Sequence, residues 1–357
     1  MFNRREFATM TLTVGVALCA VGAWHLTAAE SAPAAKPAAK SDAAKAKKAA
    51  KAKKAAEPEA PAFLTPETAG PDFAIQGEYE GPCGSGKLGA QIIALDRGEF
   101  RAVFLRGGLP GAGWDGSAKV EVDGKRDGDK AGFTGAWQAT IAGGALAGKT
   151  DAGESFKLKR VVRHSPTEGA KPPAGAIVLF DGTSVDAWDQ GQLDDRKLLC
   201  AGATSKQTFK NFTLHLEFLL PFKPGARGQA RGNSGVYLQN RYEVQVLDSF
   251  GLAGLDNECG GIYKQAAPKV NMCFPPLQWQ TYDIDFQAAR LDESGKIIKD
   301  AAVAVKHNGV AIHEGVELKA PTSRRGAKDG PPDQGPINLQ FHANPVFYRN
   351  LWLVEKK

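Results

Sequence analysis

The chain has 357 residues, of which 43% are hydrophobic and 24% charged, so it is long enough for two folded domains with sizeable cores. The formal net charge is +6 at pH 7, but residues 1–62 hold ten basic and five acidic side chains and so carry most of this excess. The nearly neutral remainder gives no indication of the basic face that nucleic-acid binding uses.

The first 29 residues have the layout of an export signal. Arg4 and Arg5 precede an apolar run over 10–26, which ends in small residues at 27–29. This order is typical of a twin-arginine secretory signal that is cleaved after 1–29, although an uncleaved membrane anchor is the alternative. We therefore expect export to the periplasm or cell envelope of a bacterium.

Residues 30–62 consist almost entirely of Ala, Lys, Pro and Glu. Such a composition cannot bury a core, so we expect a linker. Its lysines offer a possible contact with anionic polymers or lipids of the envelope, and the alternative is a merely solvated spacer.

Residues 63–165 form a Gly-rich region with several short runs of alternating polarity between turn signals. This pattern predicts a small antiparallel β domain. The stretch 81–87, GPCGSGK, resembles a phosphate-binding loop, but Leu88 stands where a magnesium-binding Ser or Thr is needed. The residues that follow alternate like strands instead of starting a helix, so no nucleotide is expected.

The region 174–357 shows apolar residues at every second position in almost every periodic segment, as in 212–220 and 279–290. Asn308-Gly309 predicts a tight hairpin turn. About 180 residues of this kind predict a two-sheet antiparallel sandwich or jelly roll, so the whole chain is expected to be all-β.

The stretch 232–251, GNSGVYLQNRYEVQVLDSFG, predicts a hairpin with one apolar face and a turn at Asn240-Arg241. Its opposite face is expected to carry Tyr237, Gln239, Glu243 and Gln245. Near the C-terminus the same alternation places Asn338, Gln340 and His342 on one face.

Such a face has two interpretations. It is either the solvated side of a sheet or a saccharide site, because amides and carboxylates match sugar hydroxyls and aromatic rings cover apolar sugar faces. Glu243 and Asp248 can serve as an acid and base pair, or can bind a metal together with His342. Asp248 can equally be a turn residue that caps the chain after the strand. His215 is a further candidate for the same side.

Two cysteines stand out. Cys259 and Cys273 enclose a loop of suitable length, and in an exported chain we expect them to form a disulfide, with free thiols as the alternative. The sequence has no GxSxG elbow and no HExxH or CxxC spacing, so a serine hydrolase or a structural zinc site is not indicated.

Five motifs in order resemble the 3-keto-disaccharide hydrolase domain family over about 174–357. They are VLFDGTSVDAW (178–188), RGNSGVYLQNRYEVQVLDSFG (231–251), GGIYKQ (260–265), PPLQWQTYDIDF (275–286) and GPINLQFHANPVFYRNLW (335–352). The resemblance implies a concanavalin-like, laminin-G-like jelly roll that acts on sugars oxidised at C3. Phe341 and Ala343 depart from the family pattern, which has an acidic residue and a glycine there.

The resemblance also implies a mechanism. A ketone at C3 acidifies the C2 hydrogen, so a base can remove that proton, the glycosidic oxygen can leave from C1, and water can then add. His342 or Glu243 is the expected base, with Asp248 and Tyr263 as candidates for the acid. The residues expected to hold the 3-keto sugar or glycan are Tyr237, Gln239, Arg241, Gln245, Gln340, Asn344 and Arg349.

Cofactor needs and other functions stay open at this point. A divalent metal bound through Glu243 or His342 can stabilise the enolate, and no other cofactor is expected. The alternatives to an enzyme are a non-catalytic, lectin-like carbohydrate-binding protein and a scaffold whose sugar face has lost its function.

Overall fold

The computed structural model describes residues 60–322 and 332–357. The expected signal at 1–29 and almost all of the linker at 30–62 therefore lie outside the described residues. Within those residues, no helix is long and apolar enough to cross a membrane. The described chain is nearly all β-structure, with one short α-helix, α2 (Pro71–Ile75), and one 3-10 turn, η1 (Gly228–Ala230). This confirms the all-β prediction.

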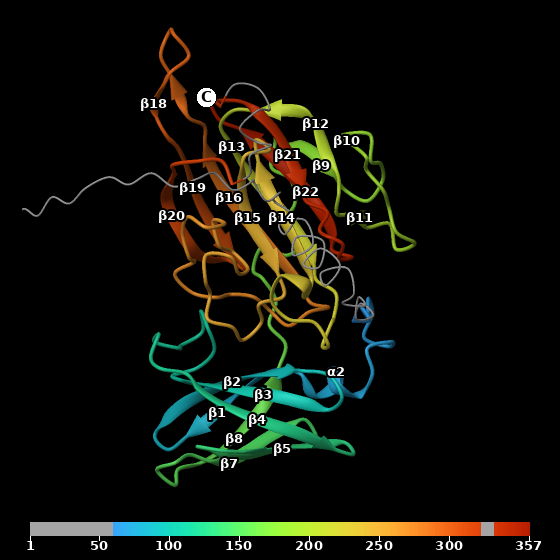
Figure 1. Cartoon of the computed structure of the whole chain (residues 1–357), viewed down its shortest axis with the longest axis vertical. Coiled ribbons are helices and arrows are strands. Elements are labelled where there is room, and N and C mark those ends of the chain that lie inside the picture. Colours follow the sequence, from blue (N-terminus) through green and yellow to red (C-terminus); the bar gives the residue numbers. More distant parts are fainter. Residues whose placement is uncertain (1–59, 323–331) are drawn as a thin grey trace, which may run out of the picture. The chain divides into compact units, whose positions relative to one another are not determined.

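The first set of strands closes into an antiparallel barrel in which each strand pairs with the next and β8 returns to β1 (Figure 1). Its strands are β1 (Gly77–Cys83), β2 (Gly86–Ala94), β3 (Glu99–Arg106), β4 (Val120–Asp127), β5 (Lys130–Thr134), β6 (Gln138–Ala142), β7 (Ala145–Lys149) and β8 (Ser155–Val161). Buried rings of Phe104, Trp137 and Phe156 pack together, with centroids 4.9–6.0 Å apart. The stretch 81–87 forms the β1–β2 hairpin, where Cys83 pairs with Gly86, and no helix follows it.

The remaining strands form the predicted two-sheet jelly-roll sandwich (Figure 1). The five-stranded sheet has the order β10 (Trp188–Asp189), β12 (Thr204–Phe209), β21 (Gly335–Leu339), β14 (Asn233–Leu238), β15 (Tyr242–Leu247). The seven-stranded sheet has the order β11 (Leu199–Cys200), β22 (Phe347–Glu355), β13 (Phe212–Leu219), β16 (Trp279–Gln287), β19 (Ala301–His307), β20 (Val310–Leu318), with β9 (Ile177–Phe180) also on β22. A separate pair consists of β17 (Arg290–Leu291) and β18 (Ile297–Lys299).

The apolar positions of both sheets lie in one buried core. Leu214 and Leu216 of the seven-stranded sheet belong to the same buried cluster as Val236 and Val244 of the five-stranded sheet. Side chains alternate across a strand, so burying these residues turns the intervening polar residues to the outer face of each sheet. Each sheet therefore has a polar outer face, and function must be sought on one of the two.

Two hairpin turns test the prediction from local sequence. Asn308 and Gly309 have φ values of 50° and 81° and connect His307 to Val310, as predicted. In the β14–β15 hairpin the residues with positive φ are Gln239 and Asn240, both at 54°, and the Arg241 amide donates to the Leu238 carbonyl. The turn is thus one residue earlier than predicted.

Candidate functional site

The outer face of the five-stranded sheet carries most of the polar residues that the sequence places there. Tyr237 on β14 lies opposite Glu243 on β15 and opposite Asn338 on β21. Gly235 lies opposite Gln245, and the two segments predicted to share a sheet therefore do so. We call the outer surface of β14, β15 and β21 the amide face.

A chain of three side chains crosses the amide face. The Tyr237 hydroxyl donates to Glu243 Oε2 at 2.8 Å, and Gln340 Nε2 donates to the Tyr237 oxygen at 3.4 Å. Gly235 leaves room for the carboxylate, because a Cβ at that position would lie 2.3 Å from Glu243 Oε1. The pairing of β14 with β15 and β21 thus brings a carboxylate, a phenol and an amide together around one glycine.

Burial changes the pKa values of the Glu243 carboxyl and the Tyr237 hydroxyl. Glu243 is only 3% exposed, and burial raises the pKa of its carboxyl to about 7, although the Tyr237 hydrogen bond acts in the opposite direction. Burial, the Glu243 charge and the nearby Tyr263 together raise the pKa of Tyr237. A carboxyl with a pKa near neutrality is suited to proton transfer at physiological pH, whereas the phenol keeps its proton and acts as a hydrogen-bond donor.

Amides extend the face beyond Glu243. Gln229 Oε1 accepts from Asn233 Nδ2 at 3.1 Å and from Gln245 Nε2 at 3.3 Å. Asn233 and Gln245 are both buried. Neither Asn233 nor Gln229 is among the residues predicted from the sequence. Asn233 is nonetheless two residues before Gly235 on the same strand, and period-two alternation could have placed it on this face.

Asp248 is not available as a free acid. Its Oδ2 accepts from Arg231 Nε at 2.7 Å, and Oδ1 accepts from the Phe250 amide at 3.3 Å. Both residues of this ion pair are buried. These contacts favour the interpretation of Asp248 as a residue that fixes the turn over a role as a catalytic acid.

Gln239 departs from the expected face. It lies in the hairpin turn, and its Nε2 donates to the carbonyls of Phe209 and Lys210. The one-residue shift of the turn removes it from the strand, so period-two alternation no longer applies.

The segment after β21 also departs from the expected alternation. The strand ends at Leu339, and Phe341 and His342 are exposed. Ala343 has φ 54°, a left-handed conformation in which glycine is more usual. Asn344 is buried, where its Oδ1 accepts from Lys223 Nζ at 2.8 Å. His342 is thus on a loop, and no described contact links its ring to Glu243.

Tyr263 and Arg241 flank the hairpin. The Tyr263 amide donates to the Glu243 carbonyl at 3.1 Å, and the charge of Tyr263 contributes to the raised pKa of Tyr237. Arg241 is buried, and its carbonyl accepts from the Thr322 amide. Tyr263 is therefore held at the backbone of Glu243 and acts electrostatically on the phenol of Tyr237.

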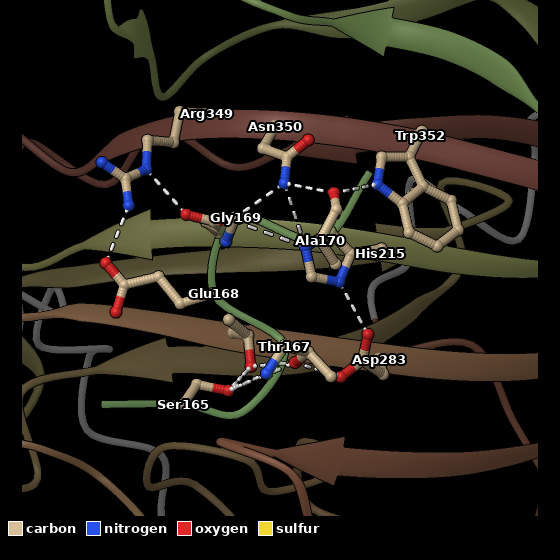
Figure 2. A network of polar contacts seen from close by, with 12 residues as sticks. Ser165, Thr167, Glu168, Gly169, Ala170, His215, Asp283, Arg349, Asn350 and Trp352 are labelled. Carbon is tan, nitrogen blue, oxygen red and sulfur yellow. Dashed lines mark hydrogen bonds and ion pairs between the residues drawn. The ribbon is translucent and has the colours of Figure 1, made fainter. Parts of the chain in front are cut away.

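Arg349 and His215 belong to the other sheet. Figure 2 shows them in a network on the seven-stranded sheet, where the segment 165–170 lies across β13, β16 and β22. Arg349 Nε donates to Glu217 at 2.6 Å, and its Nη2 donates to Glu168 at 2.9 Å. Arg349 therefore anchors a crossing segment, which we call the strap (165–170), instead of lying on the amide face.

The strap network is internally satisfied. Glu217, which is completely buried, also accepts from the Gly169 amide at 2.6 Å and from Asn350 at 2.9 Å. Burial opposes ionisation of Glu217, but these donors outweigh it and lower its pKa to about 2. His215 Nδ1 lies 2.6 Å from Asp283 Oδ1. Burial alone would lower the His215 pKa, but Asp283 and Glu217 raise it. A network so fully paired is built for structure.

A metal does not fit the residues on the amide face. Among the residues that the structure describes, no three His, Cys, Asp or Glu side chains are grouped as a bound ion would require. Glu243 is surrounded by a phenol and amides, and His342 lies on a loop. We therefore assign no step to a metal.

Cys259 and Cys273 are both buried free thiols in the structure. Cys259 Sγ lies 3.2 Å from the Tyr282 hydroxyl, which donates to the Gln245 carbonyl at 2.6 Å. Each thiol interacts with the other, and burial raises the pKa of Cys273. The disulfide expected from the sequence therefore stays a prediction.

Three solved structures from Parabacteroides distasonis, each named a putative glycosyl hydrolase, resemble part of the chain. One is 32% identical, with 52% of this chain and 85% of that chain covered and a TM-score of 0.46. The others are 17% and 18% identical, cover 51% of this chain and 95% and 99% of their own, and have TM-scores of 0.36. No curated protein matches the chain.

Residues 175–354 match the family described as the 3-keto-alpha-glucoside-1,2-lyase-like domain. The match spans half of the chain and includes all the strands of both sandwich sheets except the last residue of β22. The chain therefore belongs to the 3-keto-alpha-glucoside-1,2-lyase-like domain family and is, in general terms, a sugar-active hydrolase.

Proposed function

We propose that the sandwich domain cleaves 3-keto glycosides by removing the C2 proton, eliminating the C1 substituent and adding water. The observation that carries this proposal is the buried Glu243 carboxyl, whose pKa is raised to about 7 and which accepts a hydrogen bond from Tyr237. A base whose pKa lies near neutral pH is well suited to remove a C2 hydrogen that a neighbouring ketone acidifies. Family membership supports the same substrate class.

The steps balance with the residues of the amide face. Glu243 takes the C2 proton, and the electron pair of that C–H bond forms the C1–C2 double bond. The C1–O bond breaks, its electron pair leaves on the glycosidic oxygen, and Glu243 passes the proton that it took from C2 to this oxygen. Water then adds across the double bond: Glu243, ionised again, takes a proton from the water as its oxygen bonds to C1, and delivers that proton to C2 to give the free 3-keto sugar. The Tyr237 hydroxyl and the side-chain amides supply donors for the developing enolate oxygen.

Glu243 is preferred to His342 as the base. Glu243 is buried on β15 and accepts a hydrogen bond from Tyr237, whereas His342 is exposed on the loop after β21. An ordinary two-carboxylate glycosidase mechanism lacks its second member, because Asp248 is held by Arg231 at 2.7 Å. The geometry thus supports a single proton-transfer residue more than a pair.

Paired substrates test the proposal. The protein is given a 3-keto glycoside and its unoxidised parent, and product release is followed in deuterated water. We expect cleavage of the oxidised sugar alone, with exchange at C2, because only the ketone acidifies that hydrogen. Cleavage of both sugars without exchange would instead indicate an ordinary glycosidase. Binding of the glycan without cleavage of either sugar would indicate a lectin-like protein.

A further inference from the structure

Two acceptor oxygens on the amide face have no partner among the described residues: Asn233 Oδ1 and Gln340 Oε1. Asn233 itself is 1% exposed, and both oxygens are buried. Buried polar atoms are normally hydrogen-bonded, since leaving one unpaired is costly. Unpaired atoms also occur elsewhere in the described chain, but these two share one face with Glu243.

The orientation of each amide follows from its neighbours. Asn233 Nδ2 donates to the Gln229 carbonyl at 3.0 Å and to Gln229 Oε1 at 3.1 Å. Both partners are acceptors, so the nitrogen must face Gln229 and the oxygen must point away. Tyr237 gives its proton to Glu243, so the contact with Gln340 requires an N–H from the amide. That leaves Gln340 Oε1 as the free acceptor.

The two oxygens flank the reacting group. Asn233, Gly235 and Tyr237 occupy alternate positions on the outer side of β14. Gln340 is held beside them because its backbone N–H donates to the Gly235 carbonyl at 2.8 Å. Gly235 has no side chain, and the Glu243 carboxylate lies over it, next to the Tyr237 phenol that donates to this carboxylate. A sugar that reaches the two acceptor oxygens would therefore approach over the Glu243 carboxylate.

We propose that Asn233 and Gln340 are substrate-binding residues that accept hydrogen bonds from two separate hydroxyl groups of the sugar. This inference rests on the proposed function and adds to it a requirement for hydroxyl donors on the substrate. A site built around unpaired acceptors rejects analogues that lack the matching hydroxyl, because the acceptor is then left buried and unpaired. The ligand class is therefore a 3-keto glycoside that is unsubstituted at those hydroxyls.

The experiment compares methyl 3-keto-α-glucoside with its 4-deoxy and 6-deoxy analogues. For the natural chain we expect kcat/KM to be about tenfold or more higher for the parent sugar than for either analogue. In Asn233→Ala the preference over one analogue should fall to near one, while the preference over the other stays. Gln340→Leu should remove the second preference. Gln278→Ala is the matched control, because its buried oxygen is also unpaired but lies just before β16 on the other sheet.

The possible outcomes separate the two proposals. An Asn233→Ala protein that loses activity equally on all three sugars would show a structural role and overturn the inference, while turnover of the parent sugar by the natural chain would keep the proposed function. If the natural chain turns over none of them, calorimetric titration with the same three sugars gives the same ratios as dissociation constants. Absence of binding as well would overturn both proposals.

Discussion

At the scale of single residues, the Glu243 carboxyl determines the pH dependence of the proposed reaction. Its pKa is raised to about 7, and a base must be ionised to accept a proton. Activity should therefore rise with pH through about 7. Glu243→Gln should lower kcat by about a hundredfold or more, with Glu293→Gln as an exposed control. A variant that kept both its rate and this rising limb would exclude Glu243 as the base.

The phenol beside it gives a second prediction. The Tyr237 hydrogen bond lowers the Glu243 pKa against the effect of burial, so Tyr237→Phe should raise that pKa further and move the rising limb to higher pH. Tyr242→Phe serves as control, because Tyr242 lies in the core and precedes Glu243 on β15. The pH profile of kcat/KM measures the effect, and an unchanged profile would mean that Tyr237 does not govern the base.

At the scale of elements, the strap network predicts a cost in stability. Arg349→Met removes a charged donor from the fully buried Glu217, and because the Arg349 side chain is itself 35% exposed and other donors remain, we expect a cost of about 1–3 kcal/mol. The pKa of Glu217 is depressed to about 2, so the stabilisation is present above its ordinary value of 4.5 and is lost as pH falls toward 2.

Denaturant unfolding at pH 7 and near pH 2 measures this difference, with the exposed Arg290→Met as control. The natural chain and the variant should differ at pH 7 and converge at low pH. If Arg349 binds substrate, as its place in the closing motif predicts, the variant would instead keep its stability and show a raised KM.

The strands also show which side-chain positions could be predicted from the sequence. Period-two alternation correctly assigned Tyr237, Glu243, Gln245 and Gln340 to one face, because a continuous strand turns successive side chains to opposite sides. It failed at Gln239 and His342, which stand beyond the strand ends. Where a strand ends depends on turn geometry and on contacts far along the chain, and Ala343 at φ 54° gives no signal of its own in the sequence.

The assignment of each strand to one of the two sheets was the second feature that the sequence could not predict. Arg349 belongs to the same closing motif as Gln340, yet β22 pairs with β13 while β21 pairs with β12 and β14. The chain crosses from one sheet to the other within 340–346, so neighbours in sequence end on opposite faces of the sandwich. Without knowledge of which strands share a sheet, the motif therefore could not separate residues of the amide face from those that contact the strap.

At the scale of the whole molecule, the expected export determines the redox environment of Cys259 and Cys273. The signal expected at 1–29 would deliver the chain to an oxidising compartment, and we propose that Cys259 and Cys273 become linked there. Both are buried and each interacts with the other. The Tyr282 hydroxyl joins Cys259 to the backbone of Gln245 on the amide face, so the bond would fix the loop beside the site.

Peptide mapping without reductant tests this on two preparations, the full chain isolated from the cell envelope and a chain lacking 1–29 kept in the cytoplasm. We expect one linked species holding both cysteines, and an N-terminus following 29, in the first preparation. In the second, we expect two alkylated thiols. A cross-link constrains the unfolded chain, so reducing the exported protein should also lower its free energy of unfolding by about 2–4 kcal/mol. Freely alkylated Cys259 and Cys273 in protein whose signal has been cleaved would show that export occurs without the bond.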